Sequence, residues 1–266
     1  MTHINHSTQT QFRVRLAKTT SELKTLLQLR YEVMRTEFPM YVPENSSKID
    51  IDQWDAQSHH LGLWQSYRGH ELPVGYMRII QTNPSPLQEQ LCKIVKANLS
   101  LEAQTRKTST RPIKFLDKYQ NCTGVGIKYN GFPSDKIMEG SRLSVKKEYR
   151  NMNPGRLLVE ASFALFFNED QFPHGFIEVR ENHLAAYARY GFSEVASKYV
   201  PQDHCSHYLC YAHCTDLPNH LTEKLGSMRQ EYNRKGEITF NPPVQGGQML
   251  LSPMQRTFQN APNLFQ

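Results

Sequence analysis

The sequence predicts an α/β (α+β) domain, and three observations in its second half support that prediction. Residues 136–145 form a predicted strand, and the turn at 148–155 leads directly into the apolar helix 156–167. A second strand, 175–180, is followed by a helix at 182–190. The 266 residues suffice for one such domain of about 200 residues, with a sizeable core and an appendage.

The first elements in chain order are a strand and an amphipathic helix. Residues 11–17 alternate between apolar and polar side chains, which is typical of a strand. A helix then begins at Thr20, where Ser21 can act as the N-cap, and Pro39 and Pro43 end it. The residues that share one face of this helix are Leu23, Leu26, Leu27, Arg30 and Met34.

A hairpin and a short helix come next. Residues 59–67 and 73–80 predict two antiparallel strands joined by a loop at 67–72. A short helix is expected at 87–97. Two last strands, at 194–200 and 206–213, complete the sheet.

Composition divides the chain into a polar arm, a main domain and an extension. Residues 1–11 are polar, and the main domain spans 12–216. Within it, 98–133 is rich in Thr, Lys, Gly and Asn, which predicts a long loop insertion. The extension, 217–266, begins with one predicted helix and ends in a weakly ordered tail rich in Gln, Asn and Pro.

Charge and cysteine content restrict the possible partners and compartment. Thirty-one Lys and Arg against 25 Asp and Glu give a net charge of +6, which suits an acidic partner such as an acyl carrier protein or a nucleotide-bearing cofactor. No apolar run reaches the roughly 18 residues that a membrane span requires. Five cysteines, without a signal peptide, favour free thiols in a reducing cytoplasm.

Several motifs over residues 12–213 together resemble a known family. They are Leu29-Arg30-Tyr31-Glu32-Val33, Asp50-Ile51-Asp52-Gln53-Trp54-Asp55, Arg78-Ile79-Ile80-Gln81-Thr82-Asn83-Pro84, Glu139-Gly140-Ser141-Arg142-Leu143 and the helix end Tyr187-Ala188-Arg189-Tyr190-Gly191-Phe192. In this order they resemble the GNAT N-acyltransferases, and more closely the acyl-homoserine lactone synthases, the N-acyl amino acid synthases and their exosortase-associated relatives. The resemblance implies a central mixed, mostly antiparallel twisted sheet that is flanked by helices and splayed at its middle strands.

The chain departs from the lactone-synthase pattern at two places. Met34 and Met40 stand where that pattern has Phe and Trp, which help to enclose S-adenosylmethionine. The GNAT anion loop is here Arg150-x-x-Asn153-x-Gly155, in which Pro154 removes one N–H donor. An acyl carrier protein, whose prosthetic arm holds one phosphate, tolerates such a loop better than coenzyme A does.

The catalytic base that we predict is Glu139. An α-amino group has a pKa of about 8, so attack on a thioester needs a base that removes one proton. Strand alternation places Glu139 and Arg142 on opposite faces, and they share a pocket only if the strand bulges, which Gly140 permits. The alternative is a surface ion pair at the start of a strand.

Five charged residues are candidates for holding the acceptor. Arg78 and Arg142 offer guanidinium groups to the carboxylate of an amino-acid-like acceptor. Asp52 and Asp55 would face its ammonium group, and Arg30 would hold these carboxylates from the helix. The alternative is that the aspartates form only a solvated acidic loop.

The thioester site is predicted around the middle strand and the turn that follows it. A backbone N–H between Leu143 and Val145 would stabilise the oxyanion, and the turn at Arg150, Gly155 and Arg156 would bind the donor. The resemblance implies that Tyr187 protonates the leaving thiolate. Its alternative role is core packing on an amphipathic helix.

We predict no metal site. Residues 203–214 contain many His, Cys and Asp, but they lack a Cys-x-x-Cys pair, and strand alternation separates Cys210 from His207 and His213. Buried thiols in a last strand explain the cluster better.

The sequence therefore predicts an enzyme that moves a fatty acyl group from an acyl carrier protein or acyl-coenzyme A to the amine of a small amino-acid-like acceptor. No permanently bound cofactor and no nucleic-acid partner are expected. Three alternatives stay open: an acyl-homoserine lactone synthase using S-adenosylmethionine, an acetyl-coenzyme A acetyltransferase, and a non-catalytic module that binds acyl thioesters.

Overall fold

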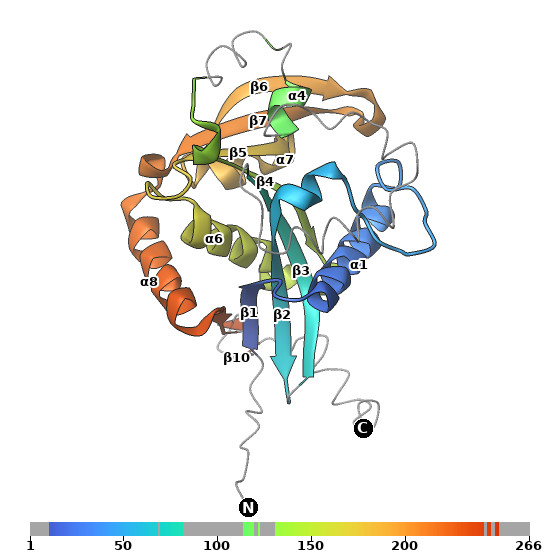
Figure 1. The fold of residues 1–266 in the computed structure, drawn as a ribbon, viewed down its shortest axis with the longest axis vertical. Helices are drawn as coiled ribbons and strands as arrows, with labels where there is room; N and C mark the ends of the chain where they lie inside the picture. The colour runs from blue at the N-terminus through green and yellow to red at the C-terminus, as the bar shows by residue number, and fades with distance from the viewer. Residues whose placement is uncertain are drawn as a thin grey trace, which may run out of the picture.

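The computed structural model describes residues 11–68, 70–81, 114–119, 122, 131–241, 244–245 and 248–249. Its main feature is an eight-stranded sheet with the order β6-β7-β5-β4-β3-β2-β1-β8 (Figure 1). Every strand pair in this sheet is antiparallel except β4 with β5, so the mixed, mostly antiparallel α/β fold that the sequence predicts is confirmed. None of the described helices combines the length and hydrophobicity needed to cross a bilayer.

The first half of the chain follows the predicted order. The elements are β1 (Gln11–Leu16), α1 (Thr20–Glu37), the 3-10 helix η1 (Gln53–Gln57), β2 (Ser58–Tyr67) and β3 (His70–Ile80). The N-cap of α1 is Thr19 rather than Ser21, because the Thr19 side chain accepts the backbone N–H of Glu22. The hairpin is tighter than the predicted loop, since Tyr67 already pairs with His70.

The predicted helix at 87–97 and most of the 98–133 insertion lie outside the described residues. Within the insertion the structure describes a short helix, α4 (Lys114–Lys118). Its Phe115 stacks on Phe176 of the sheet, with ring centroids 4.0 Å apart.

The second half contains the strand-turn-helix unit that the sequence indicates. The elements are β4 (Ile137–Val145), the 3-10 helix η3 (Lys147–Met152), α6 (Pro154–Phe166), β5 (His174–Arg180), α7 (Glu181–Ala188), β6 (Ser193–Val200) and β7 (Cys205–His213). Gly191 follows α7 with φ of 82°, where a Cβ would collide with the carbonyl oxygen of Asp216.

The described part of the C-terminal extension packs onto the main domain. Helix α8 (Asn219–Lys235) lies along α6, and Arg229 donates from Nε to the carbonyl oxygen of Ala164 at 2.7 Å. Strand β8 (Ile238–Phe240) then pairs with β1, a strand that was not predicted. Beyond it, β9 (Val244–Gln245) and β10 (Gln248–Met249) form a separate two-stranded sheet.

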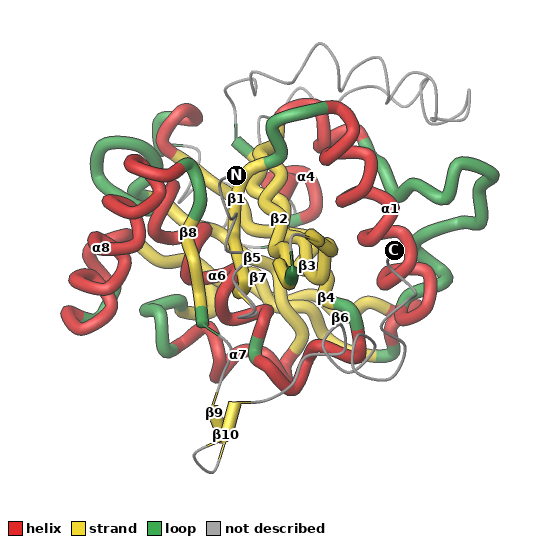
Figure 2. Tube along the Cα trace, turned by 90° about the horizontal axis from the view of Figure 1, so that it is seen from below, coloured by secondary structure: helices red, strands yellow, loops and turns green. Residues whose placement is uncertain are grey.

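Helices cover both faces of the eight-stranded sheet (Figures 1 and 2). Leu23, Leu26 and Leu27 of α1 pack with Trp64 and Tyr76 on one face. The other face carries the largest core cluster, which includes residues of α6 and α8. The face that packs against α1 is called the α1 face below.

The sheet is splayed between its two middle strands, as predicted. Strands β4 and β5 pair only over Ile137–Gly140 and His174–Ile177. Beyond these residues β4 continues beside β3 to Val145, whereas β5 continues beside β7 to Arg180. The backbones of β4 and β5 therefore part toward their C-terminal ends, and the region between these unpaired parts is called the slot below.

Candidate active site

Arginines and aspartates meet under α1 and hold one another in a buried network. Arg30 forms a bidentate pair with Asp55, with Nη1–Oδ1 at 2.8 Å and Nη2–Oδ2 at 2.9 Å, and its Nε lies 2.8 Å from Asp50 Oδ2. Arg30 and Asp55 are both 0% exposed. Burial alone would raise the pKa of Asp55, but the charges of Arg30 and Arg78 outweigh it and hold this pKa well below its usual range.

Arg78 of β3 ties this network to β4. Its Nη1 donates to Asp52 Oδ1 at 2.6 Å and to Asp55 Oδ1 at 2.9 Å, while its Nε donates to Ser141 Oγ at 3.0 Å. Its buried Nη2 has no hydrogen-bond partner within the described residues.

A capping box explains why the two aspartates converge at the start of η1. The Asp52 side chain accepts the backbone N–H of Trp54 at 2.9 Å, and the Asp55 side chain accepts the N–H of Asp52 at 2.7 Å. Arg30 was expected to hold these two carboxylates, and the structure places Arg78 beside them as well.

Three further residues complete the network and were not in the predicted site: Asp50, His60 and Tyr76. The Tyr76 hydroxyl accepts from Arg30 Nη1 at 3.0 Å and lies 2.8 Å from His60 Nδ1. Burial lowers the pKa of His60 to about 4, so this ring is neutral near pH 7. Strand alternation could have identified Tyr76, because it lies two residues before Arg78 on the same strand.

The predicted β-bulge in β4 is present, but it lies at Arg142 rather than at Gly140. Arg142 has φ of 55°, and the pairing of β3 with β4 shifts register between Tyr76 and Arg78. The bulge turns the Arg142 side chain toward the network, where it lies 3.4 Å from Asp50 Oδ2 and donates to Asp52 Oδ2 at 3.3 Å. The Arg142 and Asp52 side chains remain 21% and 26% exposed, so they border the solvent.

Glu139 lies in the paired part of β4, next to the point where the slot opens. It is 2% exposed, accepts the backbone N–H of Phe115 at 2.9 Å and has Lys114 Nζ at 3.9 Å. Burial raises the pKa of Glu139, and Lys114 partly offsets this effect. A carboxyl group with a raised pKa beside an open slot is suited to proton transfer.

The β4 side of the slot combines an exposed side chain with backbone that has no β5 partner. Leu143 is 39% exposed, whereas Val145 is buried. Arg150 donates to the Val145 carbonyl oxygen from Nε at 3.2 Å and from Nη2 at 3.0 Å, and it also binds Glu37. The Arg150 side chain therefore already binds Val145 and Glu37, and it lies near the predicted donor site.

The start of α6 faces the same end of the slot. Asn153 adopts a left-handed conformation, with φ of 53°, and caps the helix without a side-chain hydrogen bond. A Cβ built on Gly155 would lie 3.7 Å from Leu143 Cδ2, so the helix start and the exposed Leu143 are neighbours. Arg156 is 61% exposed and binds Glu160.

Tyr187 packs against the core from α7. Its ring lies edge-on to Phe192, with centroids 6.1 Å apart, and burial raises the pKa of Tyr187 to about 12. The hydroxyl therefore stays protonated near pH 7, which is the state a proton donor requires.

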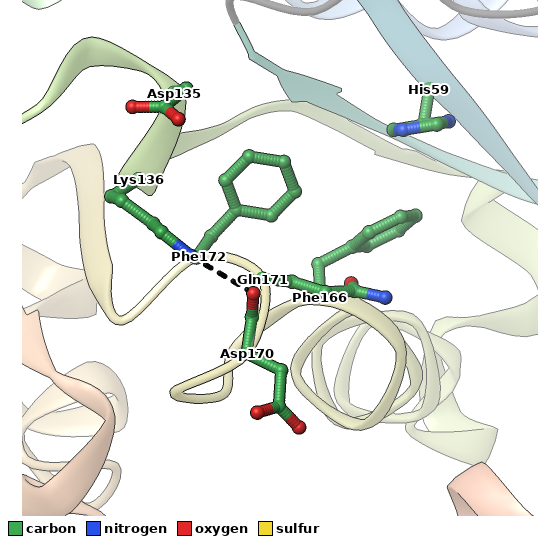
Figure 3. Close-up of a pocket in the computed structure, with 7 residues that line it drawn as sticks. All are labelled: His59, Asp135, Lys136, Phe166, Asp170, Gln171 and Phe172. Carbon is green, nitrogen blue, oxygen red and sulfur yellow. Dashed lines mark hydrogen bonds between the residues drawn. The ribbon is translucent and has the colours of Figure 1, made fainter.

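A cavity of about 340 Å³ lies away from this constellation (Figure 3). His59 and Phe166 stack beside it with centroids 4.7 Å apart, and Lys136 on its border donates to the Asp170 carbonyl oxygen at 3.0 Å. Lys136 precedes β4, so the cavity is at the closed end of the β4–β5 pair. We therefore do not assign the thioester to it.

Two groups of possible metal ligands occur among the described residues, namely Asp203, Cys205 and His207, and Glu169, His213 and Cys214. In the first group both ring nitrogens of His207 already contact carboxylates. In the second, burial and a hydrogen bond to Glu169 raise the pKa of Cys214 to about 11, so its thiol is protonated near pH 7. We assign neither group as a metal site.

Residues 29–111 match the family described as the acetyltransferase (GNAT) domain. The matched segment includes Arg30, the aspartates of η1 and Arg78. A search of curated proteins gives no match.

Similar solved structures include several acyltransferases. BjaI, a CoA-dependent acyl-homoserine lactone synthase, has 16% identity and a TM-score of 0.47, over 80% of this chain and 81% of that chain. FeeM, an N-acyl amino acid synthase from uncultured soil microbes, has 13% identity and a TM-score of 0.41, over 77% and 91%. An acyl-CoA N-acyltransferase from Pseudomonas aeruginosa has 17% identity and a TM-score of 0.40, over 75% and 97%.

Proposed function

We propose that this protein, an acyltransferase with a GNAT domain, transfers a fatty acyl group from a carrier thioester to the amine of an amino-acid-like acceptor. The observation that carries the proposal is the parting of β4 and β5 beside Glu139. An extended pantetheine arm can replace the missing strand there, because its amides hydrogen-bond to unpaired backbone.

We propose that the donor phosphate binds at the start of α6. Free N–H groups and the helix dipole favour an anion at such a terminus. Pro154 supplies no N–H, and the N–H groups of Arg156 and Leu157 donate to the Asn153 carbonyl oxygen, so the site has fewer free donors than a pyrophosphate would use. These features and the net charge of +6 support an acyl carrier protein as the donor, with acyl-coenzyme A as the alternative.

Gly155→Ala is expected to raise the KM for the acyl donor several-fold without destabilising the protein. The new methyl group has ordinary room beside Leu143, and Ala favours helix over Gly by up to about 1 kcal/mol. The methyl group nevertheless occupies space that the bound donor would use. Steady-state kinetics and thermal unfolding test this, with Gly226→Ala in α8, where no atom lies within 4 Å of the new Cβ, as the matched control. An unchanged donor KM in Gly155→Ala would argue against the assigned donor position.

For the acceptor, we propose that Arg142 binds a carboxylate and that Asp52 faces the ammonium group, because both side chains border the solvent. Arg30, Asp55 and Arg78 are completely buried and bind one another. We therefore revise the direct acceptor contacts expected for Asp55 and Arg78: these two residues hold Asp52 in place. The buried arginines keep both aspartates ionised.

The proposed reaction proceeds by direct attack. Glu139 takes a proton from the acceptor ammonium, through a water because α4 covers the carboxylate, and the amine nitrogen then attacks the thioester carbon. A backbone N–H of the Leu143–Val145 segment stabilises the oxyanion. The C–S bond breaks as the intermediate collapses, and Tyr187 gives a proton to the leaving thiolate and regains one from the nitrogen.

Lys114→Met is expected to move the acidic limb of the pH profile of kcat/KM to higher pH. The base acts when deprotonated, so the rate rises as the pH passes its pKa. Burial already raises the pKa of Glu139, and removal of the Lys114 ammonium raises it further. Lys136→Met is the control, because Lys136 lies before the same strand but binds the Asp170 carbonyl oxygen. An acidic limb at the same pH in both variants would contradict the role of Glu139.

Two product measurements separate this function from its alternatives. Mass spectrometry after incubation with acyl carrier protein, acyl-coenzyme A and amino acids should detect an N-acylated product that a binding module would not form. Release of methylthioadenosine would instead identify the lactone route. Met40 is 60% exposed, which favours an acceptor other than S-adenosylmethionine, because the aromatic enclosure is absent at this residue. We further propose that the enzyme acts in the cytoplasm.

A further inference from the structure

A chain of ionisable side chains crosses β5 and β7, and the mechanism above does not use it. His207 Nδ1 lies 2.6 Å from Glu178 Oε1, and His207 Nε2 lies 2.5 Å from Asp203 Oδ2. Lys118 of α4 binds Glu178, and Arg180 Nη2 lies 2.9 Å from Asp203 Oδ2. The chain therefore runs from Lys118 to Arg180, with His207 at its centre.

This chain lies on the β5 side of the slot. Glu178 and Arg180 follow Ile177, the last residue of β5 that pairs with β4. Alternation places both on the same face as Phe176, which α4 covers. The chain therefore lies on the part of β5 that does not pair with β4, across the slot from Arg142 on β4.

Two segments next to the slot are attached to this chain. Helix α4, whose Phe115 N–H binds Glu139, is attached through Lys118. The segment after α1 is attached through Tyr41, which hydrogen-bonds Asp203, and through Phe38, whose ring lies 4.6 Å from the Arg180 guanidinium.

The segment after α1 is also fastened to the β4 side. Glu37, at the end of α1, binds Arg150, and Arg150 holds the Val145 carbonyl oxygen of β4. Residues 37–41 therefore connect both sides of the slot on the α1 face. Loss of the contacts on β5 would release only one end of this connection.

His207 bridges two carboxylates. Its two ring nitrogens lie within hydrogen-bond distance of Glu178 and Asp203, and Lys118 Nζ lies 3.4 Å from Nδ1. The interaction with His207 and with the two lysines of α4 outweighs burial and lowers the pKa of Glu178 to about 2. The ring is thus the link between Glu178 and Asp203.

We propose that His207 is a positioning residue for the acceptor. It joins Glu178 to Asp203 and so holds α4 and residues 38–41 against the slot in which the amine must lie. This inference rests on the proposed acyl transfer. His207 transfers no proton in that reaction; it determines how the acceptor site is closed.

His207→Ala tests the proposal by kinetics. Loss of the contacts between His207 and the two carboxylates is expected to raise the KM for the acceptor about tenfold, with kcat and the donor KM within about twofold of the wild type. Added imidazole should lower the acceptor KM again, because it can occupy the vacated space and bridge both carboxylates. His207→Gln, which can donate to only one carboxylate at a time, should be intermediate, and His220→Ala on the exposed face of α8 is the control.

Hydrogen exchange gives a measurement that does not depend on activity. His207→Ala should exchange faster than the wild type in residues 38–41 and 114–118, and unchanged exchange in both would overturn the proposal. An unchanged acceptor KM, or equal losses in all kinetic parameters without imidazole rescue, would also overturn it. If the wild type forms no acylated product, the proposed function fails instead, and the exchange result still decides whether His207 holds these segments.

Discussion

Glu139→Gln is expected to lower kcat about 10²- to 10⁴-fold, the usual contribution of a general base, with little change in the KM for the donor. The carboxylate is buried one residue before Gly140, the last residue of β4 that pairs with β5, and burial raises its pKa. A carboxamide cannot accept that proton. The fold should persist, because the Gln Oε1 can still accept the N–H of Phe115.

The control for this variant is Glu148→Gln, which changes an exposed glutamate in the turn after β4. It should retain wild-type kcat, and both proteins should unfold at similar temperatures. A Glu139→Gln enzyme that transfers acyl groups at the wild-type rate would exclude Glu139 as the base. If the residual activity of Glu139→Gln rises with pH as the wild-type activity does, another group is the base.

Arg30→Met is expected to reduce the free energy of unfolding by about 3–5 kcal/mol, because it leaves buried charges without their partner. Arg30 is 0% exposed and contacts Asp50, Asp55 and the Tyr76 hydroxyl. The Met side chain fills much of the volume but supplies no hydrogen-bond donor. Urea unfolding followed by circular dichroism measures the loss.

Lys235→Met provides the comparison, since it removes only an exposed ion pair with Glu231 in α8 and should cost at most about 1 kcal/mol. If Arg30→Met does not fold, Arg30→Lys keeps the charge, loses the bidentate fork and should show a smaller loss. Equal stability of the Arg30 and Lys235 variants would mean that the buried network does not stabilise the fold.

Local patterns predicted most of the described elements because each depends on neighbours in the sequence. The helix face of Leu23, Leu26 and Leu27 and the strand-turn-helix unit at 136–167 are such cases. Strand β8 was missed, because three residues carry little periodicity and their pairing with β1 joins opposite ends of the chain.

The site was predictable where a motif fixed the residue types and less so where packing decides exposure. Arg30, Asp52, Asp55 and Arg78 do meet, yet their sequence gives no sign that Asp55 is completely buried. The bulge was expected from the need to bring Glu139 and Arg142 together, but its position at Arg142 depends on pairing with β3. The covering of Glu139 by α4 follows from a contact between distant segments.

The most direct test is a crystal structure of the protein with a stable thioether analogue of an acyl-pantetheine donor. The pantetheine should lie between β4 and β5, against the backbone of 142–145, with the sulfur beside Glu139 and the phosphate at the start of α6. An analogue bound instead in the cavity beside His59 and Phe166, with the slot unoccupied, would contradict the account.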